Sequence, residues 1–171
     1  TSLPIILKGV GSGVDTVEAL KMGCAGVVLS NHGGRQLDTA RSSIEILPEA
    51  VAALNNHDPG WRSRFEVFID GGIRRGSDVF KAVALGASAV GIGRPVLYSL
   101  ASYGQAGVER MCALFKEELT MVMRLMGTPS IADISEAHVL YSNLMTHVPA
   151  QARDHLQLDT YEPLQPAARL K

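Results

Sequence analysis

Residues 5–30 read IILKGVGSGVDTVEALKMGCAGVVLS, and residues 68–93 read FIDGGIRRGSDVFKAVALGASAVGIG, the same pattern 63 positions later. Seven identities keep this offset: Ile6/Ile69, Gly9/Gly72, Gly13/Gly76, Asp15/Asp78, Ala19/Ala82, Gly23/Gly86 and Val27/Val90. Each copy places an apolar strand before glycine, then a polar turn, a helix ending at glycine, and a second apolar strand. Chance matching among abundant Gly and Ala is an alternative, but the shared order of elements favours a true internal repeat.

The hydrophobic pattern extends this repeat into four βα units. It predicts strands over 5–8, 26–30, 66–70 and 89–93, and helices over 14–22, 43–54, 77–85 and 107–126. Strands alternating with helices predict an α/β fold with a parallel sheet and right-handed crossovers. Because an eight-stranded (β/α)8 TIM barrel contains eight such units, the four units correspond to half of one.

Between and after these units the sequence predicts several local features. Pro48 is expected to be tolerated only near the first turn of its helix, and residues 55–64, with Trp61 among them, are expected to form a surface loop. A short helix is expected over 135–144. The face of the 107–126 helix is expected to be core and carries Val108, Met111, Cys112, Phe115, Leu119, Val122 and Leu125.

Composition restricts the classes of function. The chain has 171 residues, 46% hydrophobic and 19% charged, which predicts one globular domain. Its net charge of -1 gives no reason to expect a nucleic-acid partner, and no apolar run is long enough for a membrane span. Cys24 and Cys112 have neither metal-ligand nor CxxC spacing, so they are expected to be buried thiols in a reducing compartment.

The residues that carry chemistry are expected after the strands, because active sites of barrels lie at the carboxyl ends of the strands. Lys8 follows the first strand. It has two possible roles: to neutralise a neighbouring carboxylate, or to stabilise a group that becomes anionic during a reaction.

The second strand leads into Ser30-Asn-His-Gly-Gly-Arg-Gln-Leu-Asp38. His32 and Arg35 are separated by two glycines, which permit a turn that directs both side chains at one small ligand. An imidazole can accept a proton near neutral pH, and a guanidinium can bind a carboxylate through two hydrogen bonds. A structural histidine is the alternative, and the arginine after two glycines favours a functional one.

Glycine-rich turns follow the third and fourth strands. Asp70, Gly71, Gly72, Ile73 and Arg74 follow the third, and Gly93 and Arg94 follow the fourth. Such turns expose backbone amides, and the helices that follow present their N-terminal dipoles, so the two turns together predict a phosphate site. Tight βα turns need glycine in any case, so each turn alone is weak support.

These motifs, in this order and spacing, resemble the C-terminal half of the FMN-dependent 2-hydroxy acid dehydrogenase family, which includes flavocytochrome b2, lactate oxidase and glycolate oxidase. The resemblance runs from Leu3 to Leu144 and is most specific around His32. It implies that residues 1–146 form strands 5 to 8 of a barrel with C-terminal helices. Prolines, glutamines and few large apolar residues separately predict that 147–171 is a flexible tail.

The resemblance also implies the role of each site residue. Lys8 would contact the flavin and Ser30 would touch it, His32 would be the base, and Arg35 would bind the substrate carboxylate. The residues that would bind FMN through its ribityl phosphate are Asp70, Gly71, Gly72, Ile73, Arg74, Gly93 and Arg94. The implied reaction is FMN-dependent oxidation of a small L-2-hydroxy acid, such as lactate or glycolate, to the 2-oxo acid.

Family members carry a complete barrel, whose first four strands supply a substrate-binding tyrosine and an aspartate that orients the histidine. Since no counterpart occurs here, a second hypothesis is a truncated, non-catalytic half-barrel that retains only the FMN phosphate cradle and pairs with a second chain or oligomerises. A third hypothesis is an enzyme of the inosinate dehydrogenase type, which shares the Asp70–Arg74 motif. That type requires a nucleophilic cysteine loop, which this sequence lacks, and it does not explain the His-Gly-Gly-Arg segment.

Substrate identity and electron acceptor have no signal in this sequence. The ending Ala168-Arg-Leu-Lys171 resembles a peroxisomal tripeptide with one extra lysine. The default expectation is therefore a cytoplasmic protein, with mitochondria or peroxisomes as the location of a full-length relative.

Overall fold

The computed structural model describes residues 1–144, and its centre is a parallel sheet of four strands. In spatial order the strands are β1 (Ile6–Val10), β2 (Gly26–Leu29), β3 (Glu66–Asp70) and β4 (Ala89–Gly91). The helices are α1 (Gly13–Lys21), α2 (Ser43–His57), α3 (Gly76–Ala84) and α4 (Arg94–Met126). The predicted α/β architecture of four alternating βα units is confirmed.

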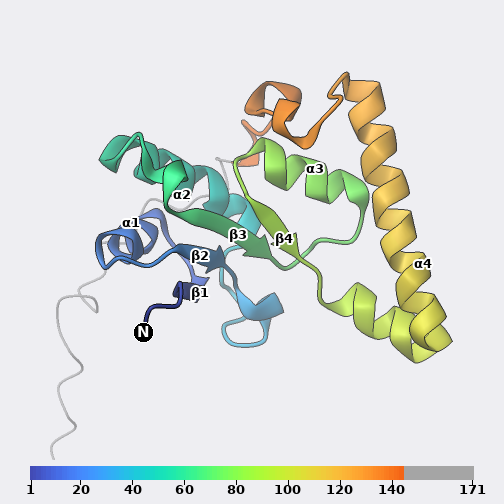
Figure 1. Ribbon diagram of the computed structural model, residues 1–171. Helices are drawn as coiled ribbons and strands as arrows, with labels where there is room; N and C mark the ends of the chain where they lie inside the picture. The colour runs from blue at the N-terminus through green and yellow to red at the C-terminus, as the bar shows by residue number, and fades with distance from the viewer. Residues whose placement is uncertain (145–171) are drawn as a thin grey trace, which may run out of the picture.

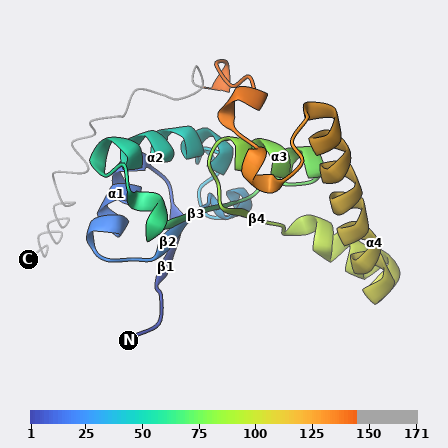
Figure 2. The ribbon, with the colours of Figure 1, turned by 45° about the horizontal axis from the view of Figure 1, so that its top comes forward.

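Within residues 1–144 the helices leave one side of the sheet uncovered. Figure 1 shows α1, α2 and α3 along one side, with α4 beyond the β4 end of the sheet. Figure 2 shows the same arrangement from another direction, and α1 packs against α2 as α3 packs against α4. Residues 31–42 extend from the carboxyl end of β2, so the predicted site region lies at one edge of the sheet.

The core lies between the sheet and its helices. Alternate residues of β2 and β3 are fully buried, as expected for strands with one face against helices. With residues of α2 they form the largest hydrophobic cluster, which includes Val27, Leu29, Val67, Ile69, Ile46, Leu47 and Leu54. These strands position the carboxyl-end loops on a rigid base.

The first strand is not buried as predicted. Ile6 is 44% exposed and Leu7 is 41% exposed. The physical reason is its place in the sheet: β1 is an edge strand that pairs with β2 alone. Its apolar sequence, which the prediction took as a sign of burial, therefore gives the sheet an exposed apolar edge.

The internal repeat extends to the way each helix begins. The Gly13 amide donates to Glu49 Oε1 (2.7 Å), and the Gly76 amide donates to Glu118 Oε2 (2.8 Å). In both cases a glutamate of the next helix satisfies the first amide of α1 or α3. A Cβ atom on Gly13 would lie 3.0 Å from the Glu49 carbonyl oxygen, so glycine permits this close approach. Shared structure at matching positions favours a true repeat over chance identity.

The predicted surface loop over 55–64 is wrong in part. Residues 55–57 belong to α2, and Trp61 is only 1% exposed. The Trp61 indole donates to Asn55 Oδ1 (2.8 Å) and makes an edge contact with Phe65, while the Arg62 guanidinium lies 4.3 Å from the ring centre. The proline and glycine before Trp61 are typical of a surface turn, so the sequence pattern did not indicate that its indole packs into the core.

Several helical segments differ from their predictions. Pro48 is the sixth residue of α2, beyond the first turn where proline was expected to be tolerated. The free energy gained by burying α2 therefore exceeds the cost of the backbone hydrogen bond that proline cannot donate. The helix predicted over 107–126 begins at Arg94, with a break at Gly104 (φ 60°, ψ -146°). In place of a helix over 135–144 there is one short 3-10 turn at Glu136–His138, and another precedes it at Ile131–Asp133.

Burial of the α4 face and of the thiols is also less than predicted. Met111 is buried, but Leu125 is 79% exposed. Cys24 is half-buried and Cys112 is exposed, and both are free thiols. Because α4 extends beyond the sheet, much of its apolar face has no sheet to cover it.

Over residues 1–144 no helix is long and apolar enough to cross a membrane, and no group of three or more potential metal ligands occurs. The tail predicted over 147–171 and the C-terminal tripeptide lie outside the described residues.

Candidate active site

A cavity of about 770 Å³ opens at the carboxyl ends of the strands and contains nearly every predicted site residue. Its walls come from the ends of β1, β3 and β4 and from the turn after β2. The lining residues are Lys8, His32, Gly33, Arg35, Gln36, Asp70–Arg74 and Gly91–Leu97. Residues far apart in the sequence thus face one space, as predicted from the parallel topology.

Lys8 binds two neighbours at the centre of the site. Its Nζ atom lies 2.9 Å from Asp70 Oδ2 and donates to Ser30 Oγ (3.0 Å). The Lys8 side chain is half exposed, and an ammonium has three donor hydrogens. Lys8 therefore neutralises a neighbouring carboxylate, that of Asp70, and one of its three N–H donors remains for a ligand.

Asp70 retains an unused acceptor beside this ion pair. Its Oδ1 atom is buried and has no hydrogen-bond partner within residues 1–144. A buried carboxylate oxygen without a donor is costly, so it indicates a place for a hydroxyl or amide of a ligand.

His32 lies in a turn with an uncommon backbone. His32, Gly33 and Gly34 have φ of 55°, 68° and 75°, all in the left-handed region. The His32 amide donates to Ser30 Oγ (3.1 Å) and the Gly33 amide donates to Asn31 Oδ1 (3.0 Å). Such conformations in non-glycine residues concentrate at functional sites. Within residues 1–144 the imidazole itself has no hydrogen-bonding partner.

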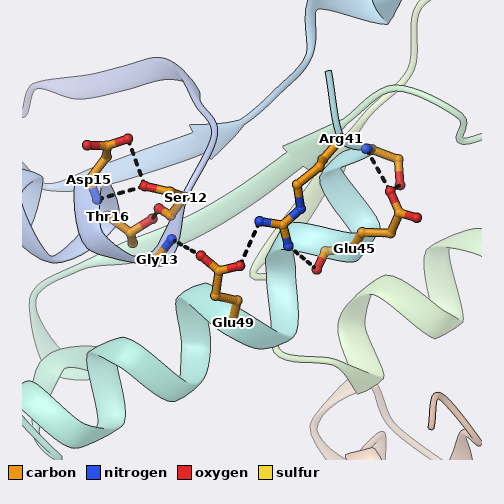
Figure 3. A network of polar contacts seen from close by, with 8 residues as sticks. Ser12, Gly13, Asp15, Thr16, Arg41, Glu45 and Glu49 are labelled. Atoms are coloured by element: carbon orange, nitrogen blue, oxygen red, sulfur yellow. Dashed lines mark hydrogen bonds and ion pairs between the residues drawn. The ribbon is translucent and has the colours of Figure 1, made fainter. Parts of the chain in front are cut away.

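The end of this loop is tied to two helices. The Arg41 guanidinium donates to Glu49 Oε2 (2.7 Å) and to the Glu45 carbonyl oxygen (3.3 Å). Since Glu49 also accepts from the Gly13 amide, one carboxylate joins the loop to the start of α1 and to α2 (Figure 3). Arg35 therefore lies in a loop held at both ends, by Ser30 and by Arg41.

The two glycine-rich turns differ in what they can offer an anion. At α3 the amides of Arg74 and Arg75 donate to Asp78 Oδ2 (2.9 and 3.0 Å), and Glu118 takes the Gly76 amide. Carboxylates of the protein therefore take the amides of Arg74, Arg75 and Gly76, and the predicted phosphate contact of this turn stays a prediction for Gly71, Gly72 and the Arg74 side chain. Gly71 and Gly72 (φ 84° and 80°) precede this capped turn and line the cavity.

The beginning of α4 remains open to a ligand. Its N-cap residue Gly93 has no side chain to cap the helix, Pro95 has no amide proton, and the Val96 amide donates to the Gly93 carbonyl oxygen (3.0 Å), so Arg94 is the residue of this turn that can donate to a ligand. Arg94 also reaches across the cavity, because its Nη2 atom lies 3.5 Å from where a Cβ on Gly33 would stand. A helix N-terminus with an arginine and a glycine is a favourable phosphate site.

Residues that sequence reasoning did not assign complete the site. Asn31 holds the His32 turn, and Gln36, Ile92 and residues 95–97 line the cavity. Asn31 and Gln36 stand inside the specific segment around His32, so their proximity was a usable signal. Pro95 to Leu97 directly follow Gly93 and Arg94 in the sequence, so their proximity to the predicted phosphate site was a usable signal as well.

Glycine-rich turns at the carboxyl ends of parallel βα strands, with a histidine and an arginine lining the same cavity, are typical of the class of α/β proteins that bind a phosphorylated cofactor beside a small acidic ligand. The sequence pattern of the FMN-dependent dehydrogenase family matches residues 1–141. The chain belongs to this family.

Individual relatives give the same result. The chain is 44% identical over 162 residues to an L-lactate dehydrogenase (cytochrome) of Saccharomyces cerevisiae, covering 95% of this chain and 27% of that protein. It is 49% identical over 140 residues to glycolate oxidase 3 of Oryza sativa subsp. indica, covering 82% of this chain and 36% of that protein.

Solved structures match the fold as well. A flavocytochrome b2 with sulfite bound superimposes with a TM-score of 0.82 at 43% identity, over 98% of this chain and 43% of that chain. A mandelate oxidase matches with a TM-score of 0.72 at 48% identity, over 80% of this chain and 39% of that chain. The chain therefore corresponds to part of a TIM-barrel domain and spans less than half the length of these proteins.

Proposed function

We propose that this chain provides the catalytic half of an FMN-dependent enzyme that oxidises a small L-2-hydroxy acid, such as lactate or glycolate, to the 2-oxo acid. One observation carries the proposal: a single cavity brings together Lys8, the His32 turn with Arg35, and two glycine-rich turns. The family and the names of the relatives support it.

FMN fits the open groups of this cavity. Its phosphate has a place at the uncapped start of α4, with Gly93 and Arg94, and near Gly71–Arg74. A ribityl hydroxyl would satisfy the buried Asp70 Oδ1, and the free donor of Lys8 would face the ring. Ser30 is only 4% exposed and does not line the cavity, so it would act through its hydrogen bond with Lys8. When bound, FMN supplies the two-electron acceptor that the protein's own side chains lack.

The remaining residues act on the substrate. The Arg35 guanidinium binds the carboxylate through two parallel hydrogen bonds and fixes the hydroxyl-bearing carbon near His32. An imidazole nitrogen of His32 accepts a proton from that substrate as its electron pair leaves. Oxidation removes two electrons and two protons in total, and proton acceptance at His32 is compatible with loss of either the α-carbon or the hydroxyl proton first.

A second candidate function is supported by the exposed edge of the sheet. Ile6 and Leu7 of β1 are exposed, and the sheet has a side without helices. A half-barrel that holds FMN by its phosphate, and that reacts only when paired with the strands that complete a barrel, fits these observations. The partner would be such a half or a second copy of this chain, and the electron acceptor would be met there.

Titration of FMN fluorescence against the chain tests the shared part of both candidates. We expect weak, saturable binding that Arg94→Ala reduces by at least roughly tenfold, because a charged contact to phosphate is lost. Arg110→Ala is the matched control, since Arg110 pairs with Glu117 on the exposed face of α4. Tight binding that survives Arg94→Ala would refute the phosphate site; L-lactate bleaching of the bound flavin would favour the first candidate over the second.

A further inference from the structure

The end of β1 contains an irregularity directly beside the candidate base. The register between β1 and β2 shifts between Lys8 and Val10, so Gly9 forms a bulge, with φ of 96°. Bulges of this kind bend a strand and redirect the side chains around them, and they are frequent beside active sites.

The imidazole of His32 occupies the space that a side chain at position 9 would need. A Cβ atom built on Gly9 would lie 2.6 Å from His32 Cε1, 3.4 Å from Nε2 and 3.6 Å from Nδ1. The first distance is far shorter than van der Waals contact. The Cε1 corner of the ring therefore points at Gly9, with both ring nitrogens farther away, an approach that only glycine permits.

The contacts of the His32 backbone do not fix the ring. Hydrogen bonds from the amides of His32 and Gly33 to Ser30 and Asn31 hold the main chain of the turn. No hydrogen bond holds the imidazole over residues 1–144, so within this half of the barrel its two side-chain torsions depend on packing. The backbone of Gly9 is the surface against which it packs.

We propose that Gly9 is a positioning residue for His32: the missing side chain at the bulge lets the imidazole rest on the β1 backbone and sets the direction of its nitrogen atoms. The geometry of this contact stands independently of the reaction, while its catalytic consequence rests on the proposed role of His32 as base.

Three single substitutions separate ring displacement from general effects. Gly9→Ala adds the clashing methyl group. Gly23→Ala matches its backbone strain, because Gly23 has φ of 80° but nothing within 4 Å of an added Cβ. Gly11→Ala adds a methyl group nearby, at a residue with open space and no positive φ.

The readout is the ring itself, observed by NMR with histidine labelled at Cε1 and the His32 signal assigned by its loss in His32→Ala. We expect a nuclear Overhauser effect between the His32 Hε1 proton and the α protons of residue 9 in the wild type, Gly11→Ala and Gly23→Ala. Gly9→Ala should lose this effect and shift the His32 signal, while the His57 and His138 signals stay in place.

Two results would overturn the proposal. One is absence of the Hε1 effect in the wild type, which also keeps the proposal testable if Gly9→Ala fails to fold. The other is retention of the effect in Gly9→Ala, or its equal loss in Gly23→Ala.

A kinetic measurement extends the test to catalysis. This chain can replace the matching segment of the Saccharomyces cerevisiae relative to give a complete hybrid barrel. There Gly9→Ala should lower kcat by roughly 10-fold to 100-fold while KM and FMN affinity change less than about twofold, because the base is misplaced but the carboxylate anchor is not. A changed KM with unchanged kcat would contradict a positioning role. An inactive hybrid that keeps the ring contact would refute the proposed function and leave the contact intact.

Discussion

Replacing Glu49 by glutamine tests how the loop that carries His32 is anchored. Glutamine keeps the shape of the side chain and an oxygen for the Gly13 amide, but it removes the charge that faces both that amide and Arg41. An amide group also turns a donor toward Arg41, which has no acceptor to offer.

The magnitude follows from the local geometry. A hydrogen bond to a charged group contributes about 1.5–3 kcal/mol and a neutral one about 1 kcal/mol, so the Gly13 bond weakens by about 1 kcal/mol. The 2.7 Å pair with Arg41, whose partners are 23% and 27% exposed, adds about 1 kcal/mol more. We therefore expect Glu49→Gln to lower the free energy of unfolding by about 2 kcal/mol.

The internal repeat provides a matched comparison in Glu118→Gln. Glu118 accepts from Gly76 in the same way, but Arg75 lies 3.5 Å away and is 72% exposed. A pair so exposed contributes almost nothing, so we expect Glu118→Gln to cost only about 1 kcal/mol.

Urea unfolding followed by far-ultraviolet circular dichroism measures both costs, and the double variant Arg41→Met with Glu49→Gln isolates the coupling of the pair. We expect a coupling of about 1 kcal/mol. Equal costs for Glu49→Gln and Glu118→Gln, or no coupling to Arg41, would refute the assignment of Glu49 as the anchor.

Three further predictions concern the site and one turn. In the hybrid barrel, His32→Ala should abolish flavin reduction by L-lactate while FMN stays bound, since the phosphate contacts are unchanged; reduction at the wild-type rate would show that His32 is not the base. Arg35→Lys should retain measurable activity with weaker substrate binding, whereas Arg35→Met should lose about 3 to 5 kcal/mol in kcat/KM; equal kinetics for the two variants would exclude Arg35 as the carboxylate anchor. The Gly60 amide, followed by Arg64, lowers the pKa of Asp58 from its usual value of 3.8. The stabilisation from that carboxylate is complete above pH 3.8 and lost as pH falls through its lowered folded-state pKa, so the difference in urea midpoint between wild type and Asp58→Asn should shrink on acidification.

The sequence predicted the fold where the pattern is repeated and local. The strands of residues 26–30 and 66–70 were correct within a residue, because buried parallel strands have continuous apolar sequences bounded by glycine. The same rule gave the wrong burial for β1, since a sequence does not state which strand lies at the edge of a sheet. It also missed Trp61, whose burial depends on Asn55 and Phe65 from neighbouring elements.

The sequence predicted which residues line the site but not the contacts between their side chains. Parallel topology was enough to bring Lys8, His32 and Arg35 to one cavity. The distances between side chains were not available, so the capture of the α3 amides by Asp78 and Glu118 could not be foreseen. Neither could the contact of the His32 ring with the bulge at β1, because bulges arise from strand pairing.

The central claim is that this chain contributes a working catalytic half to an FMN-dependent 2-hydroxy acid dehydrogenase. The most direct measurement is anaerobic mixing of the FMN-loaded hybrid barrel with L-lactate or D-lactate while the flavin absorbance is recorded. We expect bleaching by the L enantiomer alone, with pyruvate formed in a one-to-one ratio to reduced flavin. A correctly folded hybrid that binds FMN but is bleached by neither enantiomer, nor by glycolate, would contradict this claim.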